Sequence, residues 1–313
     1  MQKNTHSINC IHAIRNLVLV AFLFGPAAGC AAEANQKAFP TPNAAMVALV
    51  AAIKSHATDQ VFTILGPELA GFIDTRDKSQ NEIDRVVFLD DSRTLKLEKQ
   101  ENDPNTLIAY LGQDEWPFPA PLVKTAAGWK FDSMAGLLEI QNRQIGRNEL
   151  AAISASQAYV DAQLEYHSSD RQGDGYLQFA QRVNSNPEKF DGLYWSTANG
   201  EDVSPIGPFA AQAAATEANS SGEVVPHSGY YLKILTAQGA AATGGARSYL
   251  VDGRMIGGFG LVAWPADYKV SGVSTFIVNQ LGVVYQKDLG PGTITIAHDL
   301  TEFNPDSTWT KVE

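Results

Sequence analysis

Three oxygen-bearing side chains, Asp170, Gln172 and Asp174, stand at alternate positions just before Gly175. Carboxylate or amide oxygens in this spacing, followed by a glycine for a sharp turn, are what a calcium-binding loop requires. The pattern differs from an EF-hand because Gln181 stands where the bidentate glutamate is expected. The spacing therefore predicts a calcium site with these three ligands, and a polar loop closed by its own aspartates is the alternative.

The other residues that could do chemistry lack a recognisable spacing. No two histidines have metal-ligand spacing, and neither a G-x-S-x-G nor an S-x-x-K motif is present. Asp114 and Glu115, beside Trp116, form a carboxylate pair without a fixed partner. The glycine-rich segment Gly253–Gly260 falls inside a predicted strand, where it favours close backbone packing over phosphate binding. We therefore assign no catalytic or cofactor-binding residue.

The first 29 residues have the layout of a secretory signal peptide. Lys3 and Arg15 give a basic start, and an apolar run over residues 17–24 leads into small residues before Cys30. The run is too short to span a bilayer as a stable anchor. We therefore expect residues 1–29 to be removed and the mature protein to work outside the cytoplasm.

The residues Ala27-Ala-Gly-Cys30 resemble a bacterial lipobox, which implies that Cys30 becomes the lipidated first residue of the mature chain. Cleavage after Ala32 or Ala34 is the alternative, and it would leave a periplasmic or secreted protein. Acyl chains on Cys30 would hold the protein at a membrane without a spanning helix. Ala31 and Ala32 follow Cys30 with no aspartate beside it, and by resemblance to the sorting pattern of enteric bacteria this favours the periplasmic face of the outer membrane.

Acidic residues outnumber basic ones by 34 to 23, which gives a net charge of −11. Loss of Lys3 and Arg15 with the signal peptide makes the net charge −13. An acidic chain is a poor ligand for nucleic acid and for anionic lipid, so we expect neither as an electrostatic partner. The two cysteines are Cys10 and Cys30. Because Cys10 lies in the signal peptide, we expect a mature fold without a disulfide, held by packing alone.

The first half of the mature chain predicts helices followed by a small antiparallel sheet. A polar tether is expected over residues 30–42, and a helix begins at Asn43, which is the predicted cap. Turns are expected at residues 103–104 and 127–128. Apolar spacing predicts two more helices, over residues 58–65 and 81–89. It also predicts four strands, over residues 94–98, 106–111, 117–123 and 128–132.

Helices followed by a sheet whose last strand carries Trp129 resemble the cone-shaped fold of the nuclear-transport-factor-2-like superfamily. The resemblance implies an α+β domain over residues 43–140 that holds a pocket. Many secreted bacterial members of that superfamily are binding modules. Because the chemistry of a pocket depends on its residues, a hydrolase that uses pocket carboxylates as acid and base stays an alternative.

A long helix opens the second half. Apolar residues at helical spacing predict it over residues 134–167, with Gly146 as a weak point where it breaks in two. A further helical piece is expected over residues 176–183, and a loop rich in Ala, Ser and Gly over residues 198–228. Apolar runs then predict four strands, over residues 229–236, 255–264, 274–279 and 283–287.

A long helix followed by a meander of strands resembles the globular domain of pilins and pseudopilins. The segment Ser156–Tyr166 is similar to the tyrosine-bearing helix of those proteins. Here that helix is internal, and it lacks the exposed N-terminal apolar half that packs pilins into filaments. The resemblance implies a pilin-like α+β domain over residues 141–313, and a generic α+β domain is the alternative.

Three segments together are similar to the secreted bacterial family known as domain of unknown function 2950. They are residues 116–123, residues 145–152, and the block over residues 229–290 that includes Gly257-Gly-Phe-Gly-Leu-Val-Ala-Trp-Pro265. The resemblance spans nearly the whole mature chain and implies a two-part secreted protein. It provides no activity, cofactor or catalytic residue to transfer.

The sequence thus favours an α+β protein that is exported, lipid-anchored at Cys30 and not an enzyme. Such a protein would bind or assemble with another envelope or secretion-system protein. One alternative is a periplasmic hydrolase. Another is a structural module stabilised by calcium at Asp170, Gln172 and Asp174, and no other cofactor is expected.

Overall fold

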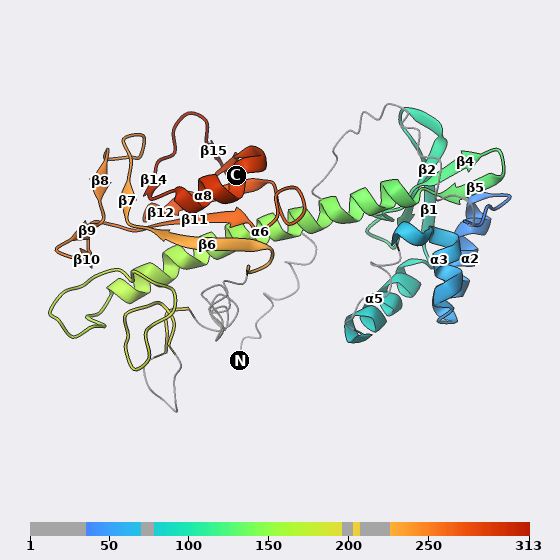
Figure 1. Cartoon of the computed structure of the whole chain (residues 1–313). Coiled ribbons are helices and arrows are strands. Elements are labelled where there is room, and N and C mark those ends of the chain that lie inside the picture. The colour runs from blue at the N-terminus through green and yellow to red at the C-terminus, as the bar shows by residue number, and fades with distance from the viewer. Residues whose placement is uncertain (1–35, 70–77, 196–202, 207–225) are drawn as a thin grey trace. The chain divides into compact units, whose positions relative to one another are not determined.

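The computed structural model describes residues 36–69, 78–195, 203–206 and 226–313 (Figure 1). The predicted signal peptide, Cys30 and most of the predicted loop over residues 198–228 lie outside the described residues. The chain divides into two compact units, Met1–Arg143 and Gln144–Glu313, and the expected domain boundary lay close by at residue 140. Each unit has its own hydrophobic core and its own antiparallel sheet, so the fold is α+β.

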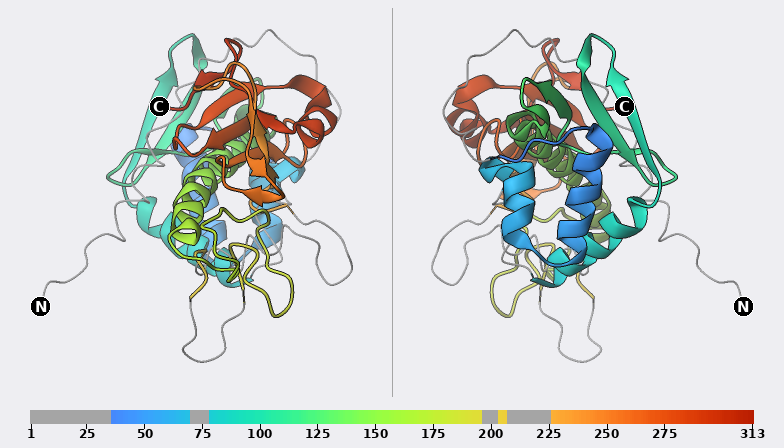
Figure 2. Two further views of the ribbon diagram at one scale, coloured as in Figure 1. Left: turned by 90° about the vertical axis from the view of Figure 1, so that its left-hand side faces the viewer. Right: turned by 90° about the vertical axis from the view of Figure 1, so that its right-hand side faces the viewer.

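Three helices open the described part of the first unit. α2 (Pro42–Lys54) is capped by Thr41, whose Oγ1 accepts a hydrogen bond from the Ala44 N–H at 3.1 Å. The prediction of Asn43 as the cap is wrong, because Asn43 lies inside the helix. α3 (Thr58–Leu65) has the predicted bounds and precedes the short turn η3 (Pro67–Leu69), and α5 (Lys78–Asp91) extends beyond the predicted third helix. α2 and α3 pack side by side, as the blue helices in the right-hand view of Figure 2 show.

The sheet of the first unit consists of short antiparallel strands. Their bounds are β1 (Leu95–Gln100), β2 (Asp103–Leu111), β3 (Trp116–Pro117), β4 (Leu122–Thr125) and β5 (Gly128–Phe131). The spatial order is β1-β2-β4-β5, and β3 pairs with β2. Residues 103–104 lie in β2 and not in the predicted turn, because the chain reverses at residues 101–102 instead. Leu49, Leu111 and Phe131 are buried in the core between helices and sheet.

A single helix, α6 (Ser133–His167), contributes its first turns to the first unit and the remainder to the second. The predicted break at Gly146 is wrong, because the helix is continuous through this position. Side chains four residues apart are bonded just before it, Arg143 to Glu139, and across it, Gln144 to Asn148. Such pairs support a helix, and they compensate for the low helix propensity of glycine.

An irregular segment follows α6, and the prediction of a helix over residues 176–183 is wrong. The backbone groups that this helix would need are bonded elsewhere. The side-chain amide of Gln163, on α6, donates to Ala180 O and accepts from the Ala180 N–H, both at 2.8 Å. The Phe179 N–H donates to Met255 O at 2.8 Å. Tertiary hydrogen bonds therefore replace the helical ones and hold this segment in an irregular conformation.

A five-stranded antiparallel sheet forms the centre of the second unit (Figure 1). In spatial order its strands are β15 (Thr310–Lys311), β13 (Tyr285–Asp288), β12 (Ser274–Asn279), β11 (Gly260–Pro265) and β6 (Tyr230–Leu235). The prediction of one strand over residues 255–264 is wrong, because Gly257 and Gly258 separate β11 from the hairpin of β9 (Leu250–Val251) and β10 (Arg254–Met255). The smaller elements are β7 (Ala237–Gln238), β8 (Arg247–Ser248), η4 (Gly290–Gly292), α8 (Thr293–Asp299) and β14 (Glu302–Phe303).

The two faces of this sheet bury separate cores. Tyr159 of α6 packs on one face with Leu261 and Phe276. α8 covers the other face, where Ala297 packs with Trp264. β6 lies at an edge of the sheet, and among the described strands it pairs with β11 alone.

Candidate functional site

The first predicted calcium ligand lies in a loop that closes on itself. The Asp170 carboxylate accepts hydrogen bonds from the N–H groups of Gly173, Asp174 and Gly175, at 2.8, 3.2 and 2.8 Å. Gly173 and Gly175 have positive φ angles, which let successive N–H groups turn toward one carboxylate. Asp170 therefore stabilises the loop through backbone donors.

The other two predicted ligands also make contacts within the fold. Gln172 Nε2 donates to Tyr166 Oη at 3.2 Å. Asp174 Oδ2 accepts from Arg254 Nε at 2.9 Å, and the guanidinium holds the pKa of this carboxyl below its ordinary value. In the described part of the chain, no group of three or more His, Cys, Asp or Glu side chains could hold a metal ion. The calcium site at Asp170, Gln172 and Asp174 stays a prediction.

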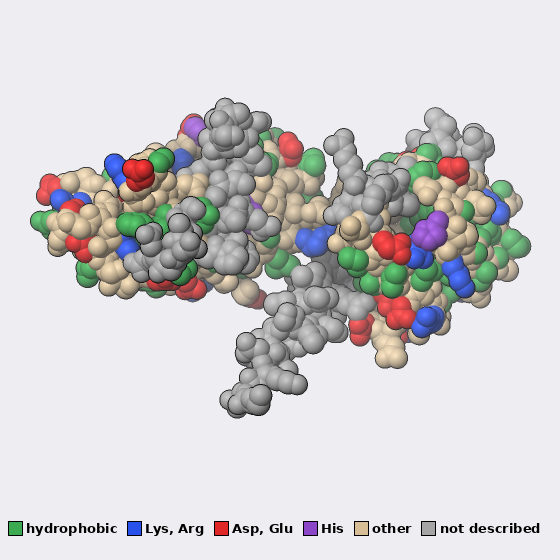
Figure 3. Space-filling model, turned by 90° about the horizontal axis from the view of Figure 1, so that it is seen from below, with side chains coloured by type: hydrophobic (Ala, Val, Ile, Leu, Met, Phe, Trp, Pro, Cys, Tyr) green, Lys and Arg blue, Asp and Glu red, His purple; other side chains and the backbone are tan. Residues whose placement is uncertain are grey.

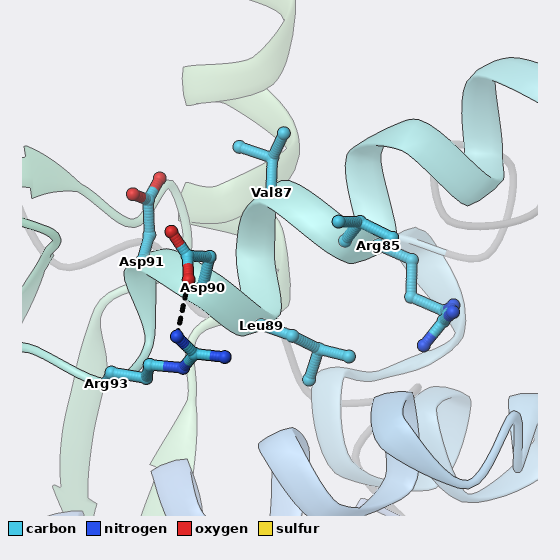
Figure 4. Close-up of a pocket in the computed structure, with 7 residues that line it drawn as sticks. Arg85, Val87, Leu89, Asp90, Asp91 and Arg93 are labelled. Carbon is cyan, nitrogen blue, oxygen red and sulfur yellow. Dashed lines mark ion pairs between the residues drawn. The ribbon is translucent and has the colours of Figure 1, made fainter.

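A hollow of about 450 Å³ lies along α5 in the first unit. Figure 4 shows that its lining residues come from α5 and from the turn after it. Asp90 and Arg93 form an ion pair there at 2.8 Å, and both side chains are more than two-thirds exposed. Among the described residues of this unit, no Asp or Glu is buried. The hydrolase alternative requires a buried carboxyl, and the described residues that line this hollow do not supply one.

α5 also carries an apolar stripe that faces solvent. Ile83, Val86 and Val87 lie on one side of the helix, at spacings of three and four residues, and are 56%, 54% and 52% exposed. Phe88 anchors the helix, since its ring lies 5.9 Å from that of Phe118 between centroids. Contiguous exposed apolar groups on a folded domain mark interaction surfaces.

A smaller apolar cavity, of about 50 Å³, lies beside the edge strand β6 in the second unit. Burial lowers the pKa of the His227 imidazole at this cavity, which favours the neutral ring. The cavity was not predicted, although the small side chains of Ala155 and Ala158, three residues apart on α6, are a sequence signal for space beside the helix. The lining residues are Ala155, Ala158, Tyr159, Val183, Ile206, His227, Leu232 and Leu261.

Two further sequence candidates have structural explanations. Glu115 pairs with Lys96 at 3.0 Å and is 60% exposed, so this carboxylate lies at the surface. A Cβ atom on Gly257 would lie 2.9 Å from Ser248 O and 3.2 Å from Tyr249 Cα. The glycine-rich segment therefore permits a close backbone approach, as predicted, although this glycine lies between strands and not inside one.

Charged side chains of both signs are scattered over the face of the molecule in Figure 3, and neither sign forms a continuous patch there. This face therefore offers no concentrated charge to attract a ligand of opposite sign. Within the described ranges, no helix combines the length and the apolar character needed to cross a membrane.

The protein is an α+β protein of two units, and the helix α6 contributes residues to both. The chain matches the model of the family described as protein of unknown function (DUF2950) over residues 36–312. It therefore belongs to that family, which confirms the membership predicted from the three sequence segments. No curated protein and no solved structure shows significant similarity to the chain.

Proposed function

We propose that this protein is exported, is lipid-anchored at Cys30, and acts as a non-enzymatic binding or assembly module of the bacterial cell envelope. The observation that carries the binding proposal is the exposed apolar stripe of Ile83, Val86 and Val87 on α5. The export proposal depends on residues 1–30, with their basic start, apolar run and lipobox-like end.

The order of elements supports the proposal by analogy. In the first unit helices precede the sheet, as in the nuclear-transport-factor-2-like superfamily, and in the second a long helix precedes an antiparallel meander, as in pilins. We propose these two architectures for the two units. Both folds serve as recognition scaffolds in other proteins, and fold-level analogy is the whole of this support.

A partner that covers the α5 stripe would remove three aliphatic side chains from water. Full burial of one such side chain contributes about 1.5–3 kcal/mol. Val86 and Val87 of the stripe also line the hollow, which adds Leu89 to the apolar surface and is bordered by the Asp90–Arg93 pair. An apolar centre with a charged rim is the usual composition of a protein–protein interface.

The binding proposal is tested by crosslinking the full-length protein in its native host and identifying the crosslinked proteins by mass spectrometry. We expect Val86→Asp to abolish a recurrent envelope partner, because the new carboxylate would be desolvated in the interface. Val47→Asp is the matched control, since Val47 is 67% exposed on α2, outside the stripe. A partner that survives Val86→Asp would show that the stripe is not the binding surface.

The anchor proposal is tested separately by fractionation. Cys30→Ser should move the protein from the membrane fraction to the soluble periplasmic fraction, and Cys10→Ser should leave it at the membrane. Mass spectrometry of the mature N-terminus should find acyl chains on Cys30. An unmodified N-terminus at Glu33 or at Asn35 would instead establish cleavage after Ala32 or Ala34 and remove the lipid anchor.

A further inference from the structure

The outer edge of β6 presents its backbone groups in a regular pattern. Antiparallel strands exchange hydrogen bonds at every second residue pair. The Ala266 N–H donates to Gly229 O at 2.9 Å. Counting every second residue from Gly229, the residues of β6 that bond to β11 are Tyr231, Lys233 and Leu235. The residues between them turn their N–H and C=O groups away from β11, and these residues are Tyr230, Leu232 and Ile234.

Both ends of this edge are occupied by the chain itself. Tyr230 and His227 exchange two backbone hydrogen bonds, each of 2.8 Å. At the other end, Thr236 O accepts a hydrogen bond of 2.8 Å from the Tyr249 N–H. Between these points, no described residue bonds to the outward backbone groups of Leu232 and Ile234. Among the residues that the structure describes, an open row of two donors and two acceptors is left at the sheet edge.

The small apolar cavity lies beside this open row. Paired residues of neighbouring strands place their side chains on the same face of a sheet. The Leu232 side chain packs on the α6 side and lines the cavity. A residue that paired with Leu232 from an added strand would therefore direct its side chain toward Ala155 and Ala158, into the space of about 50 Å³.

We propose that the β6 edge binds an extended segment of a partner polypeptide, which adds to the sheet as a short strand opposite Leu232 and Ile234. Main-chain hydrogen bonds would supply affinity, and the cavity would select a small aliphatic side chain opposite Leu232. Only a polypeptide backbone offers alternating donors and acceptors at the spacing of this row. The proposal deepens the proposed binding function, on which it rests.

The length of the open row defines the segment further. Residues 231–235 span about 13 Å at about 3.3 Å per residue, so three or four residues fit between the occupied ends. A capped peptide, acetyl-Thr-Val-Thr-amide, fits this length and places its valine opposite Leu232, with its acetyl carbonyl opposite Ile234.

The open edge is tested first by amide hydrogen exchange on the full chain without peptide. The Leu232 and Ile234 amides should exchange at least about 100-fold faster than the Tyr231 and Lys233 amides, which are bonded to β11. Equal protection of all four amides would overturn the proposal, because the edge would already be covered. Protection of Leu232 and Ile234 that rises with protein concentration would identify a second copy as the occupant and would also overturn it.

Strand addition is then tested by titrating the capped peptide at millimolar concentration. We expect slower exchange at Leu232 and Ile234, with no change at Lys233. N-methylation of the peptide valine should abolish this protection, since that N–H faces β6, whereas N-methylation of a threonine should preserve it. No protection by the unmodified peptide, or protection that ignores the methylated position, would overturn the proposal.

The cavity is tested by two substitutions on α6. Ala158→Leu should fill the rim of the cavity and weaken peptide protection at Leu232 at least about tenfold. Gln157→Leu is the matched control, because Gln157 is exposed on α6 and does not line the cavity. Equal peptide binding by both variants would refute side-chain selection. These measurements concern the second unit alone, so their failure is distinguishable from failure of the α5 stripe or of the Cys30 anchor.

Discussion

Asp174 and Arg254, 80 residues apart in the sequence, form an ion pair of 2.9 Å between Oδ2 and Nε. The same guanidinium lies over the ring of Tyr176, 4.2 Å from its centroid. Gln181 Nε2 also donates to Gly253 O at 2.8 Å. These contacts attach the loop after α6 to the β9–β10 hairpin, and they make one predicted calcium ligand part of a tertiary clamp.

Asp174→Asn should loosen this clamp. The hairpin and the loop over residues 170–181 should exchange their amide hydrogens faster, while the sheet core stays unchanged. A double-mutant cycle with Arg254→Gln should show coupling between the two side chains. The coupling should weaken with salt, because both groups are about one-third exposed. Additive effects of the two substitutions would refute the clamp.

The clamp also has a defined dependence on pH. Arg254 lowers the pKa of Asp174 below its ordinary value of 3.8. A carboxyl whose pKa is lower in the folded state contributes its stabilisation fully above the ordinary pKa, and the contribution is lost as pH falls through the folded pKa. Loop exchange should therefore accelerate only below about pH 4 in the native protein. It should be independent of pH in Asp174→Asn, after correction for intrinsic exchange.

The calcium hypothesis predicts a different response. A cation that binds only the folded state must raise the melting temperature, so addition of calcium to chelator-treated protein should stabilise it. Asp170→Asn should abolish that increase, because the carboxylate is the first predicted ligand. Identical melting curves in calcium and in chelator would remove the hypothesis. The loop of Asp170 would then be explained by its three backbone donors alone.

Gly146→Ala should stabilise the protein by about 0.5–1 kcal/mol, because alanine favours a helix over glycine. Apart from the adjoining backbone of the helix itself, no heavy atom of the described residues lies within 4 Å of the Cβ that this substitution adds. Gly136→Ala in the same helix is the contrasting variant. Its Cβ would lie 2.9 Å from Ala120 Cβ, so it should destabilise the first unit. Urea denaturation of both variants checks the pair, and a destabilised Gly146→Ala would contradict a continuous α6.

Stability should decrease in mildly acidic solution because of His227. Burial lowers the pKa of its imidazole from the ordinary value of 6.5, so the unfolded chain binds a proton more readily than the folded chain. The free energy of unfolding should therefore fall as pH drops through 6.5 and level off below the folded pKa. His227→Gln should flatten this part of the pH profile, as measured by urea denaturation. An unchanged profile would show that His227 does not cause it.

Local sequence signals were sufficient for the elements that depend on neighbouring residues. α3 has its predicted bounds because Gly66 and Pro67 follow it, and β12 has its predicted bounds because its residues are β-branched or aromatic at most positions. Family membership followed from three segments and is confirmed. These features depend on residue type and spacing alone.

Tertiary contacts decided the rest. Residues 176–183 have a helical pattern, yet Gln163 and Met255 bind the backbone of this segment and it does not form a helix. The open row at Leu232 and Ile234 exists only because β6 is placed at a sheet edge, and no periodicity reveals which strand that will be. The sequence alone determined the elements with strong local signals, the family and the predicted export signal. The clamp at Asp174, the cavity beside β6 and the exposed stripe on α5 were decided by packing, because long-range partners compete with local preference and win when they are buried.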